Sequence, residues 1–434
     1  MKNKSFIQVF EYQQLIIGKH GFEQWHWEAL GYYNELHGGD FFRLIPKGVQ
    51  FNQYVGVLQV MDVTIEILPK ISKEEKDKSK WQRVLIDMLR ECRWMKVHAN
   101  EKAALRFKPN SILEAYLEMF LQECEVLVRQ GLVKKYRTAE KNCSTLKGKL
   151  IFNKQVRTNH IHKEKFYTRH QLFDKDNIFN QIILKALKLI PVISNSPILK
   201  DRVQTLILSF PELDDVIVNS VTFQNLVYDR KTTRYKDAIE IAAMLLLNYR
   251  PDISAGHNHV LAILFKMNDL WEEYIYRQLY KNKPSNWSVR AQSSKNFWKL
   301  TSSASSKTIR PDIVIHNTSN DLKVIMDTKW KLPDNNIPSD NDLKQMYVYN
   351  EYWGGRKAIL MYPNANYTAK PKYSDGTFFK KHEVVIKSSD KTKDTTTMHG
   401  CGVLRMSVLN SDNSQLDNTI GKRITDFLKD SILI

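Results

Sequence analysis

The stretch RPDIVIHNTSNDLKVIMDTKWK, residues 310–331, decides the fold of the C-terminal part of the chain. Two short β-type runs, 312–316 and 322–330, flank the turn-rich segment NTSND. We expect the two runs to pair as an antiparallel hairpin, which would bring Asp312 at the start of the first strand close to Asp327 near the end of the second. Lys329 follows Asp327 by two residues and therefore points to the same face of its strand.

These three ionisable groups suit the hydrolysis of a phosphodiester bond. Two close carboxylates can bind Mg²⁺, with Mn²⁺ as the alternative, because hard cations prefer oxygen ligands and retain waters that can become the attacking hydroxide. The ammonium of Lys329 can orient that water and offset charge in the transition state. Asp-x14-Asp-x-Lys is a loose spacing, however, and an exposed hairpin with ordinary surface charges is the alternative interpretation.

The composition predicts a folded protein of at least two domains that attracts polyanions. The chain has 434 residues, of which 42% are hydrophobic, and this excludes a disordered or fibrous protein. A formal net charge of +18 favours nucleic acid as a partner, although a biased genomic base composition also enriches lysine. The four cysteines form no CxxC pair, and no apolar run is long enough to span a bilayer. We therefore expect a cytoplasmic protein without membrane association.

Apolar periodicity predicts a β-rich start that is followed by helices. Residues 41–45, 54–60 and 62–71 have the pattern of strands. Amphipathic helices are predicted at 81–97 and 112–133, and a further helix, capped by Asp174 or Asp176, should end at Pro191. Helical patterning also covers 203–209, 238–247 and 260–280. The sequence thus predicts an N-terminal β-rich and helical module, 1–160, and a C-terminal α/β domain with leading helices, 161–434, in a chain that is α+β as a whole.

The runs RPDIVI and VIMDTKWK together resemble the PD-(D/E)XK nuclease motif. The resemblance implies a restriction-endonuclease-like C-terminal domain, in which a central mixed sheet is flanked by helices. It also implies that Asp312 and Asp327 are the two metal-binding acids and that Lys329 is the catalytic lysine. In this family a glutamate on a preceding helix often completes the metal site, and the match is Glu272 in LWEEYI, with Glu273 as the alternative.

A following helix carries Gln-xxx-Tyr in some branches of the same superfamily. The segment DLKQMYVYN matches this pattern with Gln345 and Tyr349, which lie one helical turn apart. Upstream of the acids, cations are interleaved with Phe297 and Trp298, so the segment could follow a DNA backbone and stack on distorted bases. A solvated insertion is the alternative. The candidate DNA-binding cations are Lys295, Lys299, Lys307 and Arg310.

The order of several segments resembles the McrC family, the nuclease subunits of McrBC modification-dependent restriction systems. These segments are GVLQVMDVTIEILPKI (56–71), LKGKL (146–150), HQLFDKDNIFN (170–180), LWEEYI and DTKWK. The resemblance implies a Mg²⁺-dependent DNA endonuclease of an anti-phage defence complex. Its N-terminal module would dock on and stimulate a McrB-like AAA+ GTPase hexamer. The chain has no G-x-x-x-x-G-K-[ST] phosphate loop, so nucleotide hydrolysis falls to the partner.

Two other functions remain open on the sequence. Another restriction or repair nuclease of the PD-(D/E)XK superfamily would keep the same site and need a different partner. A non-catalytic DNA-binding or motor-activating subunit would keep the basic surface without cleaving DNA.

Overall fold

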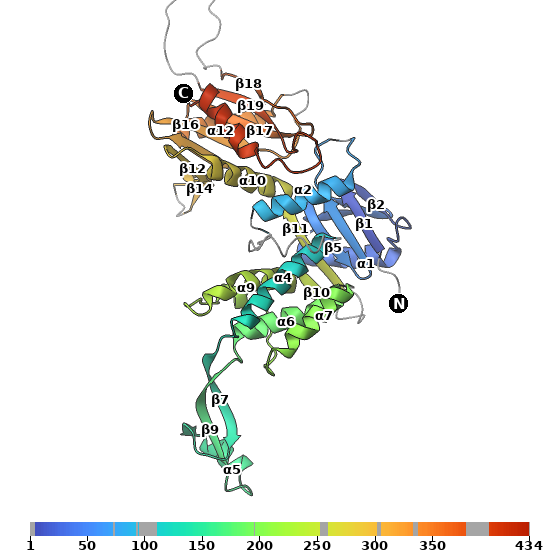
Figure 1. The fold of residues 1–434 in the computed structure, drawn as a ribbon, viewed down its shortest axis with the longest axis vertical. Helices are drawn as coiled ribbons and strands as arrows, with labels where there is room; N and C mark the ends of the chain where they lie inside the picture. Colours follow the sequence, from blue (N-terminus) through green and yellow to red (C-terminus); the bar gives the residue numbers. More distant parts are fainter. Residues whose placement is uncertain are drawn as a thin grey trace, which may run out of the picture. The chain divides into compact units, whose positions relative to one another are not determined.

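The structure is a computed structural model that describes residues 5–72, 74–92, 94, 111–194, 196–251, 259–301, 305–332, 337–378 and 399–433. The chain forms two compact units, of which unit 1 comprises Met1–Gly56, Val63–Val97 and Leu264–Ile434, and unit 2 comprises Val57–Asp62 and His98–Ile263. The expected mixture of helices and sheets is confirmed, as Figure 1 shows. The units do not follow the expected boundary at residue 160, because N-terminal segments group with the C-terminal part. The division into a docking module and a nuclease domain stays a prediction.

The N-terminal segments of unit 1 are β-rich, as the sequence predicted. Strand β1 (Ser5–Phe10) pairs in parallel with β6 (Val63–Leu68). A small antiparallel sheet has the order β2-β4-β3, with β2 at Gln14–Ile16, β3 at Phe42–Ile45 and β4 at Gly48–Phe51. Helix α1 spans Gln24–His37 and α2 spans Lys78–Glu91. The boundary between the units cuts β5 (Tyr54–Val60) and β11 (His259–Lys266).

The C-terminal part of unit 1 is built around a mixed sheet. Its described residues form six strands in the order β12-β15-β16-β17-β19-β18. Pairing is antiparallel among β12, β15 and β16, parallel among β16, β17 and β19, and antiparallel between β18 and β19. The bounds are β12 Trp287–Ala291, β15 Ile313–Asn317, β16 Leu322–Thr328, β17 Lys357–Asn364, β18 Lys372–Ser374 and β19 Gly400–Ser407. The predicted central mixed sheet is therefore present.

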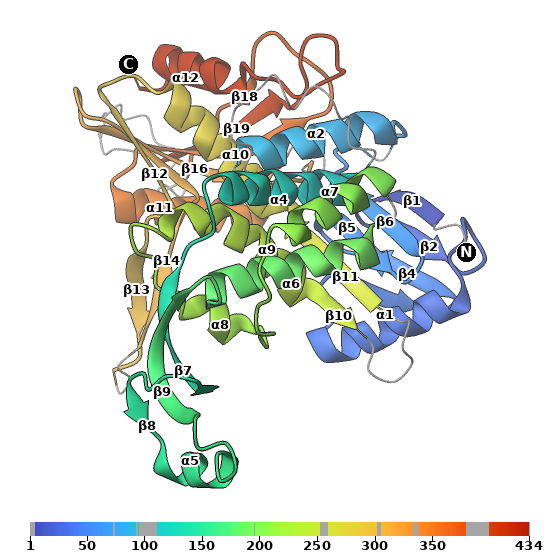
Figure 2. The same cartoon turned by 60° about the horizontal axis from the view of Figure 1, so that its bottom comes forward.

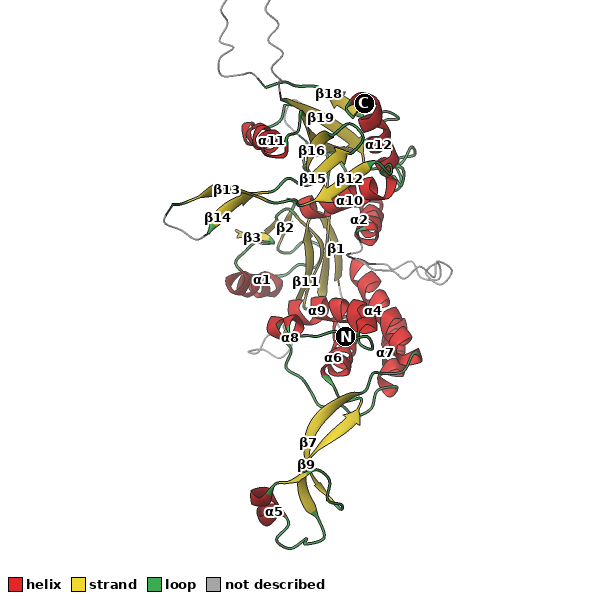
Figure 3. Ribbon diagram, turned by 90° about the vertical axis from the view of Figure 1, so that its left-hand side faces the viewer, coloured by secondary structure: helices red, strands yellow, loops and turns green. Residues whose placement is uncertain are grey.

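Helices cover both faces of this sheet (Figure 3). Helix α11 (Asp340–Trp353) lies on one face, while α10 (Met267–Asn282) and α12 (Ile420–Ser431) pack together on the other. One stripe of α11, formed by Met346, Tyr349 and Trp353, packs on strand residues such as Ile325 and Leu360. The spacing i, i+3, i+7 places these three side chains on one side of a helix, so α11 buries a single apolar stripe against the sheet.

Trp330, directly after β16, joins three elements of unit 1. Its ring centroid lies 5.4 Å from that of Trp271 in α10 and 6.4 Å from that of Trp81 in α2. Its Nε1 donates to Oε1 of Glu11, just after β1, at 2.7 Å. Its backbone nitrogen donates to Oδ1 of Asn268 at 2.8 Å. Aromatic packing and two hydrogen bonds thus fix the position of the chain where it leaves β16.

Unit 2 combines helices with a β-arm (Figure 2). Its helices are α4 Ile112–Arg129, α5 Phe152–Thr158, α6 Ile178–Ile193, α7 Pro197–Leu208, α8 Ser220–Gln224 and α9 Lys236–Asn248, with a 3-10 turn, η1, at Thr233–Tyr235. Strand β10 (Tyr249–Pro251) pairs with β11. The arm consists of α5 and the antiparallel strands β7 (Lys135–Cys143), β8 (Lys149–Leu150) and β9 (Phe166–Asp174). Across the described residues, every helix falls short of the length and apolar character that a membrane span requires.

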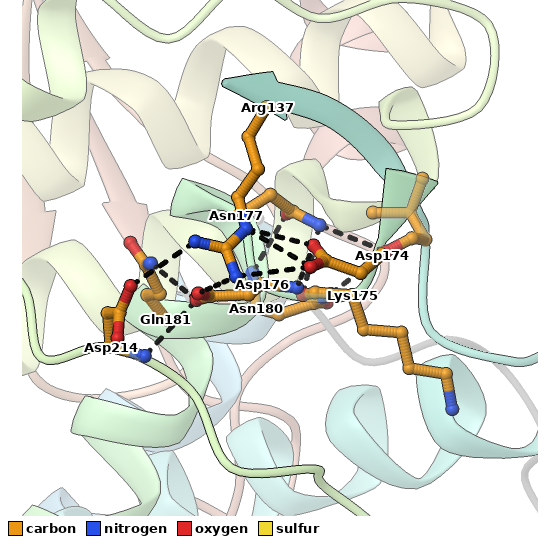
Figure 4. Close-up of polar contacts among 9 residues, drawn as sticks. Arg137, Asp174, Lys175, Asp176, Asn177, Asn180, Gln181 and Asp214 are labelled. Carbon is orange, nitrogen blue, oxygen red and sulfur yellow. Dashed lines mark hydrogen bonds and ion pairs between the residues drawn. The ribbon is translucent and has the colours of Figure 1, made fainter. Parts of the chain in front are cut away.

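Arg137 clamps the base of this arm (Figure 4). Its Nε donates to both carboxylate oxygens of Asp174 at 3.1 Å, and its terminal nitrogens lie 2.9 Å from Asp176 and 3.4 Å from Asp214. Asp176 is buried, and its Oδ1 also accepts a hydrogen bond from Nε2 of Gln181 in α6 at 2.7 Å. One guanidinium thus ties both ends of the arm to the helices of unit 2.

Three sequence expectations about secondary structure were wrong. Helix α6 is capped by Asn177 and not by Asp174 or Asp176, and it continues past Pro191 to Ile193. Pro191 lacks the backbone N–H that would bond to the preceding turn, and the helix ends two residues later. Residues 260–280 do not form one helix, since β11 runs to Lys266 and α10 begins at Met267.

Glu11 should make the stability of the protein depend on pH. Burial raises its pKa to about 7 from an ordinary value of 4.5, against the opposing hydrogen bonds from Lys70 and Trp330. Between these two values the folded state retains a proton that the unfolded chain has released, so the free energy of unfolding falls as the pH rises. Glu11→Gln should remove the contribution of Glu11 to this slope, on the order of 3 kcal/mol over the window, and leave the contributions of the other carboxyl groups with raised pKa values. Thermal unfolding of both proteins, from about pH 5 to about pH 8, measures it.

The exposed Glu28 in α1 provides the control for Glu11. Glu28→Gln should follow the pH dependence of the natural protein. If the melting curves of Glu11→Gln and the natural protein shift in parallel with pH, the assigned pKa of Glu11 is wrong.

Arg137→Ala should loosen the arm. The substitution leaves the buried Asp176 without its cation, and because Arg137 is itself partly exposed we expect a loss of only about 1–2 kcal/mol in unit 2. Chymotrypsin should then cut within residues 135–174 several times faster. Arg169→Ala, which removes an exposed ion pair with Glu140 on the same arm, is the matched control. Equal cleavage rates for the two variants would contradict a clamping role for Arg137.

Candidate active site

The two aspartates of the sequence motif face each other across β15 and β16. The strands pair with Ile313 opposite Met326, and one further step of this register places Asp312 opposite Asp327. Asp327 is buried, with 1% of its surface exposed, and Asp312 is partly buried. The predicted hairpin and the juxtaposition of its two carboxylates are therefore confirmed.

The environment of these carboxylates resists their ionisation. Burial raises the pKa of Asp327 to about 7, and the charge of Asp312 adds to this rise. Burial likewise raises the pKa of Asp312 to about 6, and here the charge of Glu272 adds to it. Close carboxylates with raised pKa values need a cation to be stable in the ionised form.

Lys329 supplies one such cation. Its Nζ lies 2.5 Å from Oδ2 of Asp327, which has no hydrogen-bond donor aligned with it among the described residues. Burial works against the charge of Lys329, but Asp327 and Asp312 outweigh it, so the net shift of the lysine pKa is upward. Lys329 is thus held as an ammonium beside the acids, on the strand face that the sequence predicted.

Helix α10 brings a third carboxylate to the acids. Burial is the main cause that raises the pKa of Glu272, and the negative charges of Asp269 and Asp327 add to this rise. Its Oε1 accepts a hydrogen bond from Nε2 of Gln292. Glu273 instead forms an ion pair with Arg277 one turn along the helix. Of the two glutamates left open by the sequence, Glu272 is therefore the one whose charge couples to the aspartates.

Tyr349 and Gln345 border the site from α11. The hydroxyl of Tyr349 donates to the carbonyl oxygen of Arg310 at 2.8 Å and accepts from Nε2 of Gln345 at 2.6 Å. Arg310 precedes Asp312 by two residues, so this chain of hydrogen bonds fixes the approach of the backbone to the first acid. In this arrangement the Gln-xxx-Tyr pair positions the backbone.

Two residues of the site were missed by the sequence analysis. Oδ2 of Asp312 accepts from the backbone nitrogen of Thr328 at 2.7 Å and from its Oγ1 at 3.0 Å. Gln292 contacts Glu272 and also donates its backbone N–H to the carbonyl oxygen of Asp312 at 2.9 Å. Its φ of 53° is unusual for a residue with a side chain. Threonine and glutamine are not distinctive residue types in a sequence, so no pattern marks these two positions. Only the fold brings Gln292 to the acids.

The donor set fits a hard divalent cation that keeps part of its water shell. Among the described residues no group of three His, Cys, Asp or Glu side chains is close enough to enclose a metal ion. The paired oxygens of Asp312 and Asp327 nevertheless match the one or two carboxylates by which Mg²⁺ is commonly held, with waters as the remaining ligands. Glu272 lies in reach of their electrostatic field as a candidate additional ligand.

The four predicted DNA-binding cations lie in different environments. Nζ of Lys295 donates to the carbonyl oxygen of Tyr352 at 2.6 Å, so this lysine is engaged within the protein. Lys299, Lys307 and Arg310 have exposed side chains. Strands β13 (Lys295–Lys299) and β14 (Ser306–Ile309), which carry the three lysines, pair as a separate antiparallel hairpin.

Comparisons with solved structures place this fold among known ones. One match is a chain in the refined half-complex from a tetradecameric assembly of Thermococcus gammatolerans McrB AAA+ hexamers with bound McrC. Its TM-score is 0.69 at 17% identity, and the match covers 99% of this chain and 100% of that chain. A chain in the cryo-EM structure of the Thermococcus gammatolerans McrBC complex matches with a TM-score of 0.49 and 18% identity, over 65% of this chain and 89% of that one. Such low identity shows a shared fold alone. No curated protein matches.

A family model supplies the sequence relationship that the structural likeness lacks. The model of the McrBC 5-methylcytosine restriction system component matches residues 49–363, which is well over half of the chain. The match includes the hairpin with both aspartates, α10 and α11. The chain therefore belongs to the family of McrBC 5-methylcytosine restriction system components.

Proposed function

We propose that this protein is the McrC-type nuclease subunit of a McrBC-like restriction complex and hydrolyses phosphodiester bonds of DNA with Mg²⁺ or Mn²⁺. The observation that carries the proposal is the pairing of Asp312 with the buried Asp327, with the ammonium of Lys329 2.5 Å from Asp327. The arrangement on a mixed sheet between helices supports a PD-(D/E)XK type of domain. A protein that used these residues only for stability would gain little from two opposed carboxylates with raised pKa values.

The roles of the side chains follow from their positions. Asp312 and Asp327 would hold the cation, and Glu272 is a candidate additional ligand. The cation, when bound, supplies Lewis acidity and a water of lowered pKa. Lys329 would orient the attacking water and stabilise negative charge on the phosphorane, because its ammonium is fixed at the edge of the acids. Thr328 and Gln292 hold Asp312 and Glu272 in place, and Tyr349 holds the backbone before Asp312.

The partner that we propose is a McrB-like AAA+ GTPase hexamer. The solved structure with the shared fold contains McrB AAA+ hexamers with bound McrC, which supports such a motor as the partner of this chain as well. In this scheme the motor supplies nucleotide hydrolysis and DNA recognition, while this chain stimulates the motor and cuts the DNA. Control of cleavage would then rest on assembly of the complex.

Asp327→Asn should abolish DNA cleavage by the assembled complex. The amide keeps the size of the carboxylate but removes the charge that binds the cation and holds Lys329, so we expect a loss of at least about a hundredfold in rate. The measurement is cleavage of plasmid DNA by the complex with Mg²⁺ and nucleotide. Isothermal titration with Mn²⁺ should show weaker metal binding by the same variant.

Asp321→Asn is the matched control for Asp327. Asp321 lies in the turn at the opposite end of the same hairpin, where it is exposed and contacts His316. This variant should cleave DNA at the natural rate. If Asp327→Asn also cleaves at that rate, the chain is a non-catalytic subunit and the nuclease assignment is wrong.

DNA cleavage should require the motor partner. We expect the chain to co-purify with a GTPase encoded by an adjacent gene, and we expect the pair to cut methylated DNA with GTP faster than either protein alone. Replacing GTP by ATP and methylated by unmethylated DNA tests the nucleotide and the modification separately. A lone chain that cuts at the full rate would point to an independent nuclease of the same superfamily.

A further inference from the structure

The hairpin of β13 and β14 presents an aromatic side chain and a lysine on one exposed face. Cα pairing sets Trp298 opposite Lys307, and Lys295 opposite Ile309, with a bulge between Asn296 and Trp298. Residues directly opposite each other in an antiparallel pair share a face, and alternate residues of one strand do so too. Lys307 and Ile309 therefore lie on the same face, and this places Lys295 and Trp298 there as well. Lys299, opposite Ser306, lies on the other face.

The end of this face that carries Lys295 and Ile309 is fixed against α11. Ile309 packs against the core between α11 and the sheet. Nζ of Lys295 lies over the ring of Trp353 at 5.1 Å and also donates to the carbonyl oxygen of Tyr352. The ring of Phe297 meets that of Tyr352 at 5.5 Å and 60°. These contacts use Lys295 as an anchor, so the hairpin leaves the unit in a defined direction, as Figure 3 shows.

The outer part of the same face is open. The exposed fraction of Trp298 is 55%, and Lys307 is also exposed. Neither side chain forms a hydrogen bond, ion pair or ring contact with any residue in the described part of the chain. The ring of Trp298 and the ammonium of Lys307 are therefore both available to a ligand on this face.

Charge and position indicate which ligand binds this face. Residues 285–311 contain five cations, Arg290, Lys295, Lys299, Lys307 and Arg310, and no Asp or Glu. Strand β14 leads within three residues from Ile309 to Asp312, the first of the paired acids. A polyanion on this face would therefore extend into the active site. Lysine neutralises phosphate, and a tryptophan face stacks on any unpaired base.

We propose that Trp298 and Lys307 form a DNA contact in which the lysine binds a backbone phosphate and the indole stacks on a base that is unpaired near the cleavage site. This inference rests on the proposed function, and it names the substrate of that site as duplex DNA that is locally opened. Within the hairpin it separates three lysines by role: Lys307 contacts DNA, Lys295 anchors the hairpin, and Lys299 faces away.

Fluorescence anisotropy with the full chain tests the contact. The probes are a fluorescein-labelled duplex with two unpaired central bases and the same duplex fully paired, both without divalent cation so that nothing is cut. Trp298→Ala should weaken binding of the opened duplex about tenfold and binding of the paired duplex much less, whereas Trp298→Phe should retain most of the affinity. Lys307→Ala should weaken both and reduce the slope of log affinity against log salt by about one.

Lys299→Ala is the matched control, because it removes the same charge from the opposite face of the hairpin. It should leave the affinity for both duplexes within about twofold of the natural value. Equal losses for Lys299→Ala and Lys307→Ala, or unchanged binding by Trp298→Ala, would overturn the proposal. Unchanged melting temperatures of the exposed variants confirm that each is folded.

The remaining outcomes separate this contact from the catalytic assignment and from a protein interface. If Asp327→Asn still cleaves DNA while Trp298→Ala binds opened DNA poorly, the proposed chemistry fails and the contact stands. If Asp327→Asn is inactive and Trp298→Ala binds normally, only the contact fails. If Trp298→Ala binds DNA normally but no longer co-purifies with the motor, the face is a protein interface and the proposal is wrong.

Discussion

The antiparallel register of β15 and β16 is the constraint on which the candidate site depends. It sets Asp312 opposite Asp327 at one end of two interior strands of a sheet that helices cover on both faces. Burial removes hydration from both carboxylates and is the main reason why the pKa of each is raised. The charge of Asp312 adds to the rise at Asp327, and the charge of Glu272 adds to the rise at Asp312. Neighbouring residues offset this negative charge. Lys329 forms an ion pair with Asp327, and Thr328 donates two hydrogen bonds to Asp312. The divalent cation that we propose for this pair would offset the remaining negative charge.

Distant parts of unit 1 hold the strand end that carries these groups. Trp330 directly follows Lys329, and its indole is fixed by Glu11, Trp81 and Trp271. The N-terminal segment therefore contributes to the same compact unit as the acids, although more than three hundred residues separate Glu11 from Trp330 in sequence. A division of labour between an N-terminal docking module and a C-terminal nuclease would have to operate across this shared core. The buried hydrogen bond to Glu11 is one physical link between the two.

The accuracy of the sequence-based expectations depended on how local the interactions are. The hairpin at 313–328 was predictable because two short β-type apolar runs, the turn-rich segment between them and the two-residue spacing of Asp327 and Lys329 are all local signals. Residues 260–280 were misassigned because Val260, Leu261, Ala262 and Ile263 are consecutively buried, and a continuous apolar run favours a buried helix as much as a buried strand. The cap of α6 was misplaced by one residue or more because Asp174, Asp176 and Asn177 are all good capping residues. Arg137 pairs with both aspartates, which leaves Asn177 as the cap.

The sequence by itself determined which residues the proposed chemistry would use: two acids and a lysine at strand spacing, in a basic chain. It also determined the order of segments that is typical of the family. The spacing of residues along a strand and the order of segments are local properties, and the net charge is a sum over residues. They can therefore be recognised without knowledge of the fold. Only the tertiary structure decided which residues surround them. It places Glu272, whose pKa is raised by burial and by the charge of Asp327, near the aspartates, and it brings Gln292 and Thr328 into contact with the acids. It also engages Lys295 in a hydrogen bond to the backbone of Tyr352. It also placed the N-terminus in the unit of the acids, because the packing of side chains such as Trp330 joins residues that no sequence pattern connects.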